Sequence, residues 1–367
     1  MLGSIIQSDY HEPALKRPGK VHLSKISVIG GGSFGTVIAN IIARNGHDVL
    51  FWVRSDDLVD EVNHKHENSQ YLPGYELSER VIATKDMATA VISSNVIFVA
   101  VPSSSFREVV KQIVQFAPKG AMLISTTKGI EAGTFKLMSQ ILLEQAPNAK
   151  VGVLSGPNLA KEIANNHLTG TVIASNSEEV RDTVREILRS ETFRVYTNDD
   201  MYGVELGGSL KNIYAIIAGL TAELGMGYNT NSMLVTRSLT EMVRFGREIG
   251  ADPMTFLGLA GVGDLVVTCS TPLSRNYRIG QALGEGKTIE EAAEEVGQVA
   301  EGVNTVKLVK EKAEELDVYM PLATGLYKII CENESIESIV SSLMLSEQAL
   351  DVEFAASAEK ILNGAEE

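Results

Sequence analysis

The feature that most constrains the fold is a glycine-rich turn near the start of the chain. Its spacing is G-x-G-x-x-G, formed by Gly30, Gly32 and Gly35. An apolar run at 26–29 precedes the turn, a helical pattern at 33–45 follows, and a second apolar run ends at Arg54. This order predicts strand, turn, helix and strand, with backbone N–H groups presented to a pyrophosphate at the helix N-terminus. The alternative is a glycine-rich turn that binds nothing.

The residue after the second apolar run bears on which dinucleotide would bind. Enzymes that use NAD commonly place Asp or Glu there, to bond the ribose hydroxyls of the adenosine. This chain has Arg54 and then Ser55 before its first acid, Asp56. A guanidinium can pair with a 2′-phosphate, so the sequence favours NADPH, or use of both NADPH and NADH. The alternative is that Arg54 only stacks on the adenine.

Short β-branched runs alternate with helical patterns as far as about residue 200. The runs expected to be strands are 26–29, 49–53, 96–101, 122–125, 151–154 and 171–174. Because they are apolar throughout rather than alternating, they predict a mostly parallel sheet covered on both faces, an α/β doubly wound fold of the Rossmann type. Longer helical patterns follow and predict an all-α domain. We therefore expect a flexible extension at 1–23, a dinucleotide-binding domain at 24–200 and a helical substrate-binding, catalytic domain at 201–367.

Composition excludes several classes of protein. The chain has 367 residues and a net charge of −15, which argues against binding nucleic acid or acidic membranes. No apolar run reaches the ~18 residues of a membrane span. Residues 1–22 lack the order of a secretory signal. The two cysteines, Cys269 and Cys331, are too few for a disulfide scaffold and lie near no metal-ligand pattern. We expect a cytoplasmic protein without a metal.

Lys211 is the first candidate for catalysis. It is the only charged residue between Leu206 and Ala222, in a helix of apolar and small side chains. Loss of hydration would lower the pKa of the ammonium towards the range useful for proton transfer. A lysine whose ammonium reaches water along the helix surface fits the pattern equally well.

Further polar residues follow predicted strands or begin helices in the second half of the chain. Lys128 comes just after a strand, at the sheet edge where ligands bind in this fold, although it also fits a surface lysine. Gly156 follows the next strand in the same way. Asp264 lies on a glycine-flanked turn, where a helix cap is the simpler interpretation. Ser274 fits an N-cap, and Arg275 and Asn276 after it would make an anion site.

Eight segments in order give the chain a resemblance to a known family. They are GGGSFGT, VAVPS, TKGIE, SGPNLAKE, ELGGSLKNIYAI, GLAGVGDLVVTC, SRN and VAEGV, and the resemblance covers the chain from about Lys25 to beyond residue 340. The chain resembles the NAD(P)-dependent sn-glycerol-3-phosphate dehydrogenases of bacterial type. The resemblance implies reversible hydride transfer between NAD(P)H and C2 of dihydroxyacetone phosphate, giving sn-glycerol 3-phosphate for phospholipid synthesis. It also suggests a homodimer.

The resemblance assigns roles that the residues alone leave open. It implies that Lys211 is the general acid and base, and that Lys128 is shared by cofactor and substrate and polarises the ketone. Substrate contacts would be Gly156, Asn158, Asp264, Ser274, Arg275 and Asn276. Cofactor contacts would be Ser33, Phe34, Arg54, Ala160, Arg275, Val299 and Glu301, besides the glycines. The family commonly has Ser or Thr in place of Asn158, which puts that contact in question.

Two other functions compete with this one. A related two-domain reductase of a different hydroxy acid or keto acid would share both domains and a catalytic lysine. It would have less use for the anion site at Arg275 and Asn276. A non-catalytic protein that senses dinucleotides would keep the glycine-rich turn and have no need of Lys211.

Overall fold

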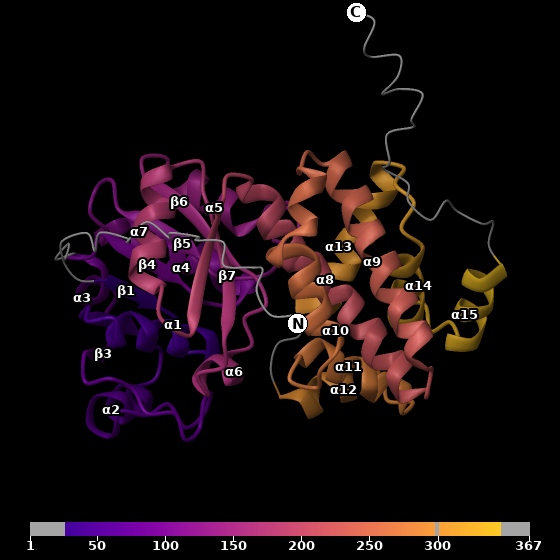
Figure 1. The fold of residues 1–367 in the computed structure, drawn as a ribbon, viewed down its shortest axis with the longest axis horizontal. Helices are drawn as coiled ribbons and strands as arrows, with labels where there is room; N and C mark the ends of the chain where they lie inside the picture. The colour runs from indigo at the N-terminus through magenta and orange to yellow at the C-terminus, as the bar shows by residue number, and fades with distance from the viewer. Residues whose placement is uncertain (1–25, 298–300, 346–367) are drawn as a thin grey trace, which may run out of the picture.

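The computed structural model describes residues 26–297 and 301–345. The extension expected at 1–23 and the predicted cofactor contact Val299 lie outside these residues. Figure 1 shows two parts side by side, a sheet with its covering helices in indigo to magenta and a helical part in orange to yellow. The long helix α8 (Met201–Glu223) begins the helical part.

The first part is built on one eight-stranded sheet in the order β3-β2-β1-β4-β5-β6-β7-β8. All neighbouring strands are parallel except β6 and β7, which are antiparallel. The predicted mostly parallel, doubly wound sheet is therefore confirmed. The strands are β1 (Ile26–Ile29), β2 (Val49–Trp52), β3 (Val81–Thr84), β4 (Val96–Val99), β5 (Met122–Ser125), β6 (Lys150–Ser155), β7 (Thr169–Ala174) and β8 (Phe193–Asn198).

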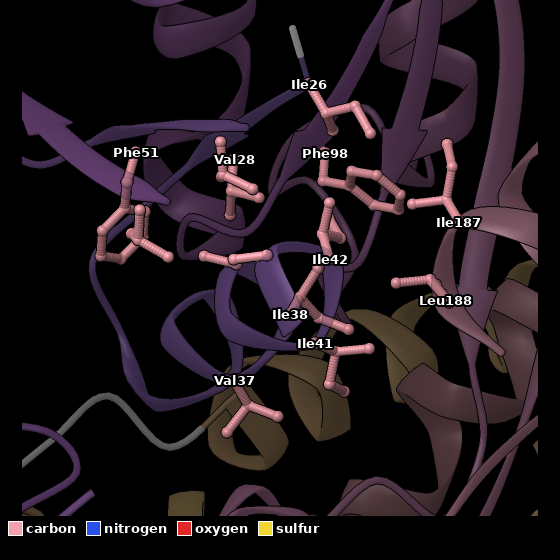
Figure 2. Close-up of a cluster of buried hydrophobic side chains, with 14 of the residues drawn as sticks. Ile26, Val28, Val37, Ile38, Ile41, Ile42, Phe51, Phe98, Ile187 and Leu188 are labelled. Atoms are coloured by element: carbon pink, nitrogen blue, oxygen red, sulfur yellow. The ribbon is translucent and has the colours of Figure 1, made fainter. Parts of the chain in front are cut away.

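Two hydrophobic clusters cover opposite faces of the sheet, since successive strand residues point to opposite sides. Figure 2 shows the first, where Ile38 and Ile42 of one helix lie against Val28 and Phe98 of the sheet. The second cluster lies on the other face. The helices of this part are α1 (Ser33–Arg44), α2 (Asp56–Lys65), α3 (Met87–Val91), α4 (Ser103–Phe116), α5 (Met138–Gln145), α6 (Ala160–Ala164) and α7 (Glu178–Leu188).

Two strands, β3 and β8, do not appear among the predicted ones. Both lie at sheet edges, and their residues alternate between buried and exposed. An edge strand with one face in water does not need the continuous apolar run that marks the inner strands. Continuous apolar runs therefore do not mark either edge strand.

The helical part is arranged around α8, which is buried along most of its length. Its other helices are α9 (Tyr228–Glu248), α10 (Asp264–Cys269), α11 (Arg275–Gly284), α12 (Ile289–Val296), α13 (Glu301–Glu315), α14 (Pro321–Cys331) and α15 (Ile336–Leu345), with a 3-10 turn at Pro253–Leu257 and a π turn at Leu259–Gly263. Helices α8 and α11 touch through glycines. A Cβ on Gly219 would lie 1.9 Å from the Tyr277 carbonyl oxygen, and one on Gly280 would lie 1.9 Å from that of Ile216.

Candidate active site

The glycine-rich turn joins β1 to α1, and each glycine has a different reason to be there. Gly30 has φ of +124°, and a Cβ on it would lie 2.4 Å from the carbonyl oxygen of Ala100. A Cβ on Gly35 would lie 2.1 Å from the carbonyl oxygen of Gly30. Gly32 has no heavy atom within 4 Å of its Cβ position. Two glycines are thus required by packing, while the third leaves open space at the helix start.

That open space suits a dinucleotide pyrophosphate. Gly32 is the N-cap of α1, and the first turn has neither a side-chain cap nor an acidic residue. The N–H groups of this turn and the positive end of the helix dipole are therefore available to an anion. The residues present fit the phosphates of a nicotinamide dinucleotide.

A loop after α2 holds the glycine-rich turn in shape. The side chain of Asn68, fully buried, donates hydrogen bonds to the Gly31 carbonyl at 2.9 Å and to the Thr36 hydroxyl at 2.7 Å. The hydroxyl of Ser33 donates to the Tyr71 carbonyl at 2.8 Å. Ser33, a predicted cofactor contact, therefore also ties the turn to this loop.

The other predicted cofactor contacts of the first part also follow the carboxyl ends of strands. Phe34 and Ala160 are partly buried and pack against the first hydrophobic cluster. Arg54 is exposed and lies just beyond β2, the strand next to β1. This is the position at which a residue meets the adenosine ribose in the fold.

Lys211 lies on α8 with its side chain 7% exposed, so the interpretation as a surface-reaching lysine is wrong. Its ammonium donates to a carboxylate oxygen of Asp264 and, at 2.5 Å, to the hydroxyl of Thr268. Burial lowers the pKa of Lys211 to about 8; the carboxylate of Asp264 opposes this shift, and the positive charge of Lys128 adds to it. The ammonium is therefore suited to exchange a proton near neutral pH.

Lys128 follows β5 and is not a free surface lysine. Its ammonium donates to the other carboxylate oxygen of Asp264 at 2.5 Å and to the carbonyl of Gly156 at 3.0 Å. Gly156, which follows β6 with φ of +134°, thus contributes its carbonyl to the site. Two strand ends of the sheet and one helix of the other part meet at this point.

Asp264 stands between the two lysines. Its side chain is 1% exposed and does not cap α10, so the simpler interpretation as a cap is wrong. It begins α10, and Thr268 lies one turn further on the same face, where its hydroxyl accepts from Lys211 and donates to the Asp264 carbonyl at 2.6 Å. Sequence reasoning missed Thr268. The spacing of four residues from Asp264 was the available signal, because i and i+4 share a helix face.

The predicted triplet lies at the start of α11. The hydroxyl of Ser274 accepts from the Tyr277 N–H at 3.3 Å, which confirms the predicted N-cap. Asn276 is buried, and its side-chain oxygen accepts from the N–H of Gly302 at 3.1 Å. Arg275 is exposed at the helix start. The positive end of this helix and a guanidinium occur together, as an anion site requires.

Glu301 joins this triplet to the sheet. At the start of α13, its carboxylate accepts from the N–H of Ser103 at 3.2 Å and from its hydroxyl at 2.5 Å. Ser103 begins α4, which follows β4. A Cβ on Gly129, the residue after Lys128, would lie 3.0 Å from the same carboxylate. Contacts therefore run continuously from the two lysines to the start of α11.

Asn158 lies after Gly156 and presents one defined atom. Its side-chain N–H donates to the Thr171 hydroxyl at 2.9 Å, and that hydroxyl donates to the Ser155 carbonyl at 3.0 Å. The amide orientation is therefore set by the hydroxyl. The side-chain oxygen of Asn158 is buried and has no hydrogen-bond partner among the described residues. It offers an acceptor at a position where the resemblance predicts a substrate contact.

Family profiles match both parts of the chain. The profile of the NAD-dependent glycerol-3-phosphate dehydrogenase N-terminus matches residues 25–181, and that of the C-terminus matches residues 200–341. The chain belongs to the NAD-dependent glycerol-3-phosphate dehydrogenase family. This membership confirms the predicted resemblance and the nicotinamide cofactor.

Individual members of the NAD-dependent glycerol-3-phosphate dehydrogenase family agree with this assignment. A protein of Saccharophagus degradans named glycerol-3-phosphate dehydrogenase (NAD(P)+) is 53% identical over 89% of this chain and 92% of its own. One of the same name from Alcanivorax borkumensis is 54% identical over 89% of this chain and 96% of its own. The crystal structure of a glycerol-3-phosphate dehydrogenase from Coxiella burnetii covers 89% of this chain and 100% of its own, at 37% identity and a TM-score of 0.85.

Neither a metal-binding cluster nor a membrane-spanning helix occurs among the residues that the structure describes. Within 26–297 and 301–345, no three His, Cys, Asp or Glu side chains gather where they could share a metal ion. In the same ranges, no helix has the length and apolar character needed to cross a bilayer.

Proposed function

We propose that Lys211, Lys128 and Asp264 form the catalytic group of this NAD(P)+-dependent glycerol-3-phosphate dehydrogenase. The observation that carries the proposal is the sharing of one buried carboxylate by two ammonium groups. Each ammonium has three N–H donors. Among the contacts described, Lys211 uses two on Asp264 and Thr268, and Lys128 uses two on Asp264 and Gly156. Each lysine keeps a donor for one substrate oxygen.

The arrangement suits reduction of a ketone to an alcohol. When bound, a reduced nicotinamide supplies hydride to C2 of dihydroxyacetone phosphate. Lys128 polarises the C2 carbonyl, since its positive charge stabilises the developing alkoxide. Lys211 then gives the alkoxide a proton, and in the reverse direction it takes that proton back. Asp264 holds both ammonium groups in place, and it does not exchange the proton itself.

The substrate phosphate is assigned to the start of α11, with Ser274, Arg275 and Asn276 as its contacts. The buried side-chain oxygen of Asn158 would accept a hydrogen bond from a substrate hydroxyl. The glycine-rich turn, Phe34, Arg54, Ala160 and Glu301 are assigned to the cofactor. Of the competing functions, the reductase of another acid lacks the support of the two family profiles, and the non-catalytic sensor leaves the buried lysine without a use.

We also infer that the protein acts as a cytoplasmic homodimer that supplies sn-glycerol 3-phosphate for phospholipid synthesis. The resemblance to bacterial members of the family supports the dimer and the metabolic role. The cysteine content supports the compartment, because secreted proteins of this kind commonly rely on disulfides. Sedimentation of the purified chain at a mass other than twice that of one chain would contradict the dimer.

The direct test is the reaction itself. Purified protein with dihydroxyacetone phosphate and NADPH is expected to lose the absorbance of reduced nicotinamide and to produce sn-glycerol 3-phosphate. Protein that binds NADPH but shows no loss dependent on dihydroxyacetone phosphate would contradict the proposed function.

Replacing Arg54 with aspartate is expected to shift cofactor preference towards NADH. The carboxylate repels a 2′-phosphate and accepts from ribose hydroxyls, so the ratio of kcat/KM for NADPH to that for NADH should fall about tenfold or more. Arg194→Asp, a change of the same kind on the edge strand β8, serves as the control. An unchanged ratio in Arg54→Asp would leave Arg54 only stacking on adenine.

Replacing Arg275 with alanine is expected to raise the KM for dihydroxyacetone phosphate about 10- to 100-fold, because a charge-assisted hydrogen bond to phosphate contributes about 1.5–3 kcal/mol. The control is a second substrate, dihydroxyacetone without its phosphate. The KM for this ketone should be nearly the same in wild type and in Arg275→Ala. Equal losses for the two ketones would assign Arg275 to the cofactor instead.

The pH dependence should differ between the two directions. Reduction needs protonated Lys211, so kcat/KM for dihydroxyacetone phosphate should be constant below and fall above about pH 8. Oxidation needs neutral Lys211, so kcat/KM for sn-glycerol 3-phosphate should rise with pH and level off above about 8. Measurements from pH 7 upwards avoid titration of the phosphate, whose second pKa is about 6. If kcat/KM rose with pH in both directions, or fell with pH in both, a single lysine could not be the acid of one direction and the base of the other.

A further inference from the structure

Glu205 is a buried acid that joins the two parts of the molecule. It lies on α8, the helix that carries Lys211, and is 2% exposed. Its carboxylate accepts from the hydroxyl of Ser139 at 2.5 Å and from the backbone N–H of Ser139 at 3.1 Å. It also accepts from the backbone N–H of Met138. Met138 and Ser139 begin α5, so an acid of the helical part caps a helix of the sheet part.

This placement is costly for the charged form. Burial raises the pKa of Glu205 to about 7, although the hydrogen bonds from Ser139 and Met138 act in the opposite direction. The capping interaction has to offset the loss of hydration. A serine or threonine on the α5 side could cap the same helix without burying a charge. The use of a carboxylate from α8 therefore points to a role in joining the two parts.

The start of α5 is closely connected to Lys128. The loop 130–137 is closed at its base by a bridge between Ile130 and Leu137, and the Glu131 N–H donates to the Lys136 carbonyl at 2.8 Å. Lys128 and Gly129 immediately precede Ile130 of this bridge, and α5 begins immediately after Leu137. A shift of the first turn of α5 would therefore move the backbone that carries Lys128.

Two further contacts support this connection from α8. The hydroxyl of Ser209, one turn after Glu205, lies 3.4 Å from the Gly129 carbonyl and 3.1 Å from that of Glu205. A Cβ on Gly208 would lie 3.5 Å from the Lys128 side chain. The face of α8 that carries Glu205 therefore lies directly against the segment that carries Lys128.

The outer side of the loop is held from within the sheet part. Arg107 on α4 pairs with Glu131 at 2.7 Å and with Glu144 of α5 at 2.6 Å. These pairs fix the loop and α5 to α4. They do not fix either of them relative to Lys211, whereas the contacts of Glu205 do.

We propose that Glu205 is a positioning residue: by capping α5 from α8, it holds the loop 130–137, and with it Lys128, in register with Lys211 and Asp264. The proposal rests on the proposed function, in which both lysines act on one substrate oxygen. Glu205 touches neither lysine, so it acts through the backbone between Ile130 and Ser139.

The test compares Glu205→Gln with a matched variant, Glu241→Gln. Glu241 is equally buried, its pKa is also raised to about 7 by burial, and it also caps a helix, accepting from Leu322 and Ala323 at the start of α14. The hydroxyl of Tyr214 on α8 also donates to Glu241, at 3.2 Å, and all three of these partners are in the helical part. In each variant, an amide nitrogen replaces an oxygen that faces an N–H donor, so both should have a lower Tm.

Activity should separate the two variants. Glu205→Gln is expected to lower kcat for dihydroxyacetone phosphate about 10- to 100-fold, since a small misplacement of a catalytic group has effects of this size. Glu241→Gln should keep kcat within about twofold at a temperature where both are folded. If Glu205→Gln fails to fold, Ser139→Ala removes only the hydroxyl donor and should lower kcat in the same direction. Equal kcat values in wild type and a folded Glu205→Gln or Ser139→Ala would overturn the proposal.

Two measurements distinguish positioning from general weakening. The charge of Lys128 lowers the pKa of Lys211, so release of Lys128 should move the alkaline limb of kcat/KM above pH 8. The groups facing Lys211 are Asp264, Lys128 and the Cys269 thiol. Of these, Glu205→Gln displaces only Lys128. In a Lys128→Ala background, Glu205→Gln should then change kcat less than about twofold, because the two residues act as one unit.

The remaining outcomes separate this proposal from the proposed function. Two results would overturn the positioning role while leaving the function in place. One is that the losses of kcat in Glu205→Gln and Lys128→Ala add fully in the double variant, and the other is that the alkaline limb of kcat/KM does not move in Glu205→Gln. Full activity in Lys128→Ala alone would instead contradict the assignment of Lys128 in the proposed function.

Discussion

Replacing Lys211 with alanine is expected to lower kcat for dihydroxyacetone phosphate about 10²- to 10⁴-fold, the usual contribution of a positioned acid or base. The protein should still bind NADPH, because the glycine-rich turn and Lys211 lie on different parts of the structure and share no contact that the structure describes. Stopped-flow or steady-state kinetics measures kcat, and titration with NADPH followed by fluorescence measures cofactor binding.

Lys211→Arg provides a sharper version of this test. The guanidinium keeps the positive charge beside Asp264 but does not lose its proton in proteins. The variant should therefore be as inactive as Lys211→Ala in the oxidative direction, where a base is needed. A variant with arginine that oxidises sn-glycerol 3-phosphate at the wild-type rate would exclude Lys211 as the base.

Replacing Asp264 with asparagine is expected to have the second largest effect. The carboxylate raises the pKa of Lys211 against burial and against the charge of Lys128, so its removal should lower that pKa below 8. Less of the protonated acid is then present at neutral pH, and the two ammonium groups lose the carboxylate that holds them. We expect kcat/KM for reduction to fall about 100-fold, with the alkaline limb shifted to lower pH.

Stability measured on Asp264→Asn gives an independent check. Loss of one partner from a buried charge pair costs about 3–5 kcal/mol of unfolding free energy. Because neutral Lys211 avoids that cost, the destabilisation should shrink as the pH rises through the lowered pKa. Asp252→Asn, at an exposed turn of the same part, should change the unfolding free energy little at any pH above 5. A loss of stability independent of pH would mean that Asp264 acts by packing rather than by charge.

Local sequence patterns predicted much of this fold. The inner strands are apolar on both faces, and the strand, turn and helix around Gly30 and Gly35 follow from backbone geometry that only glycine allows. The edge strands β3 and β8 could not be predicted in the same way, because a strand buried on one face alternates. The reversed direction of β7 and β8 depends on which strands pair, and no local pattern carries that information.

The candidate site could be predicted only as separate residues. Lys211 stands out as a lone charge in an apolar helix, but its burial depends on packing by α10 and α11. The role of Asp264 depends on Lys128, 136 residues earlier, and on Lys211, 53 residues earlier. Thr268 could be found only by its spacing of four residues from Asp264, and Glu205 shows no feature in sequence that separates it from ordinary polar residues of helices. Their roles follow from distances between elements, which a single sequence does not contain.

The glycine contact between α8 and α11 has a consequence for how the molecule can move. Backbone touches backbone at Gly219 and Gly280, so no side chain lies between the two helices at these points. In any separation of the two parts, Lys211 and the start of α11 would therefore move together. Opening would lengthen the path from the nicotinamide to the reacting carbon, while the distance from the proton donor to the phosphate anchor would stay constant. A substrate bound at the start of α11 would therefore keep its position relative to Lys211 during such a movement.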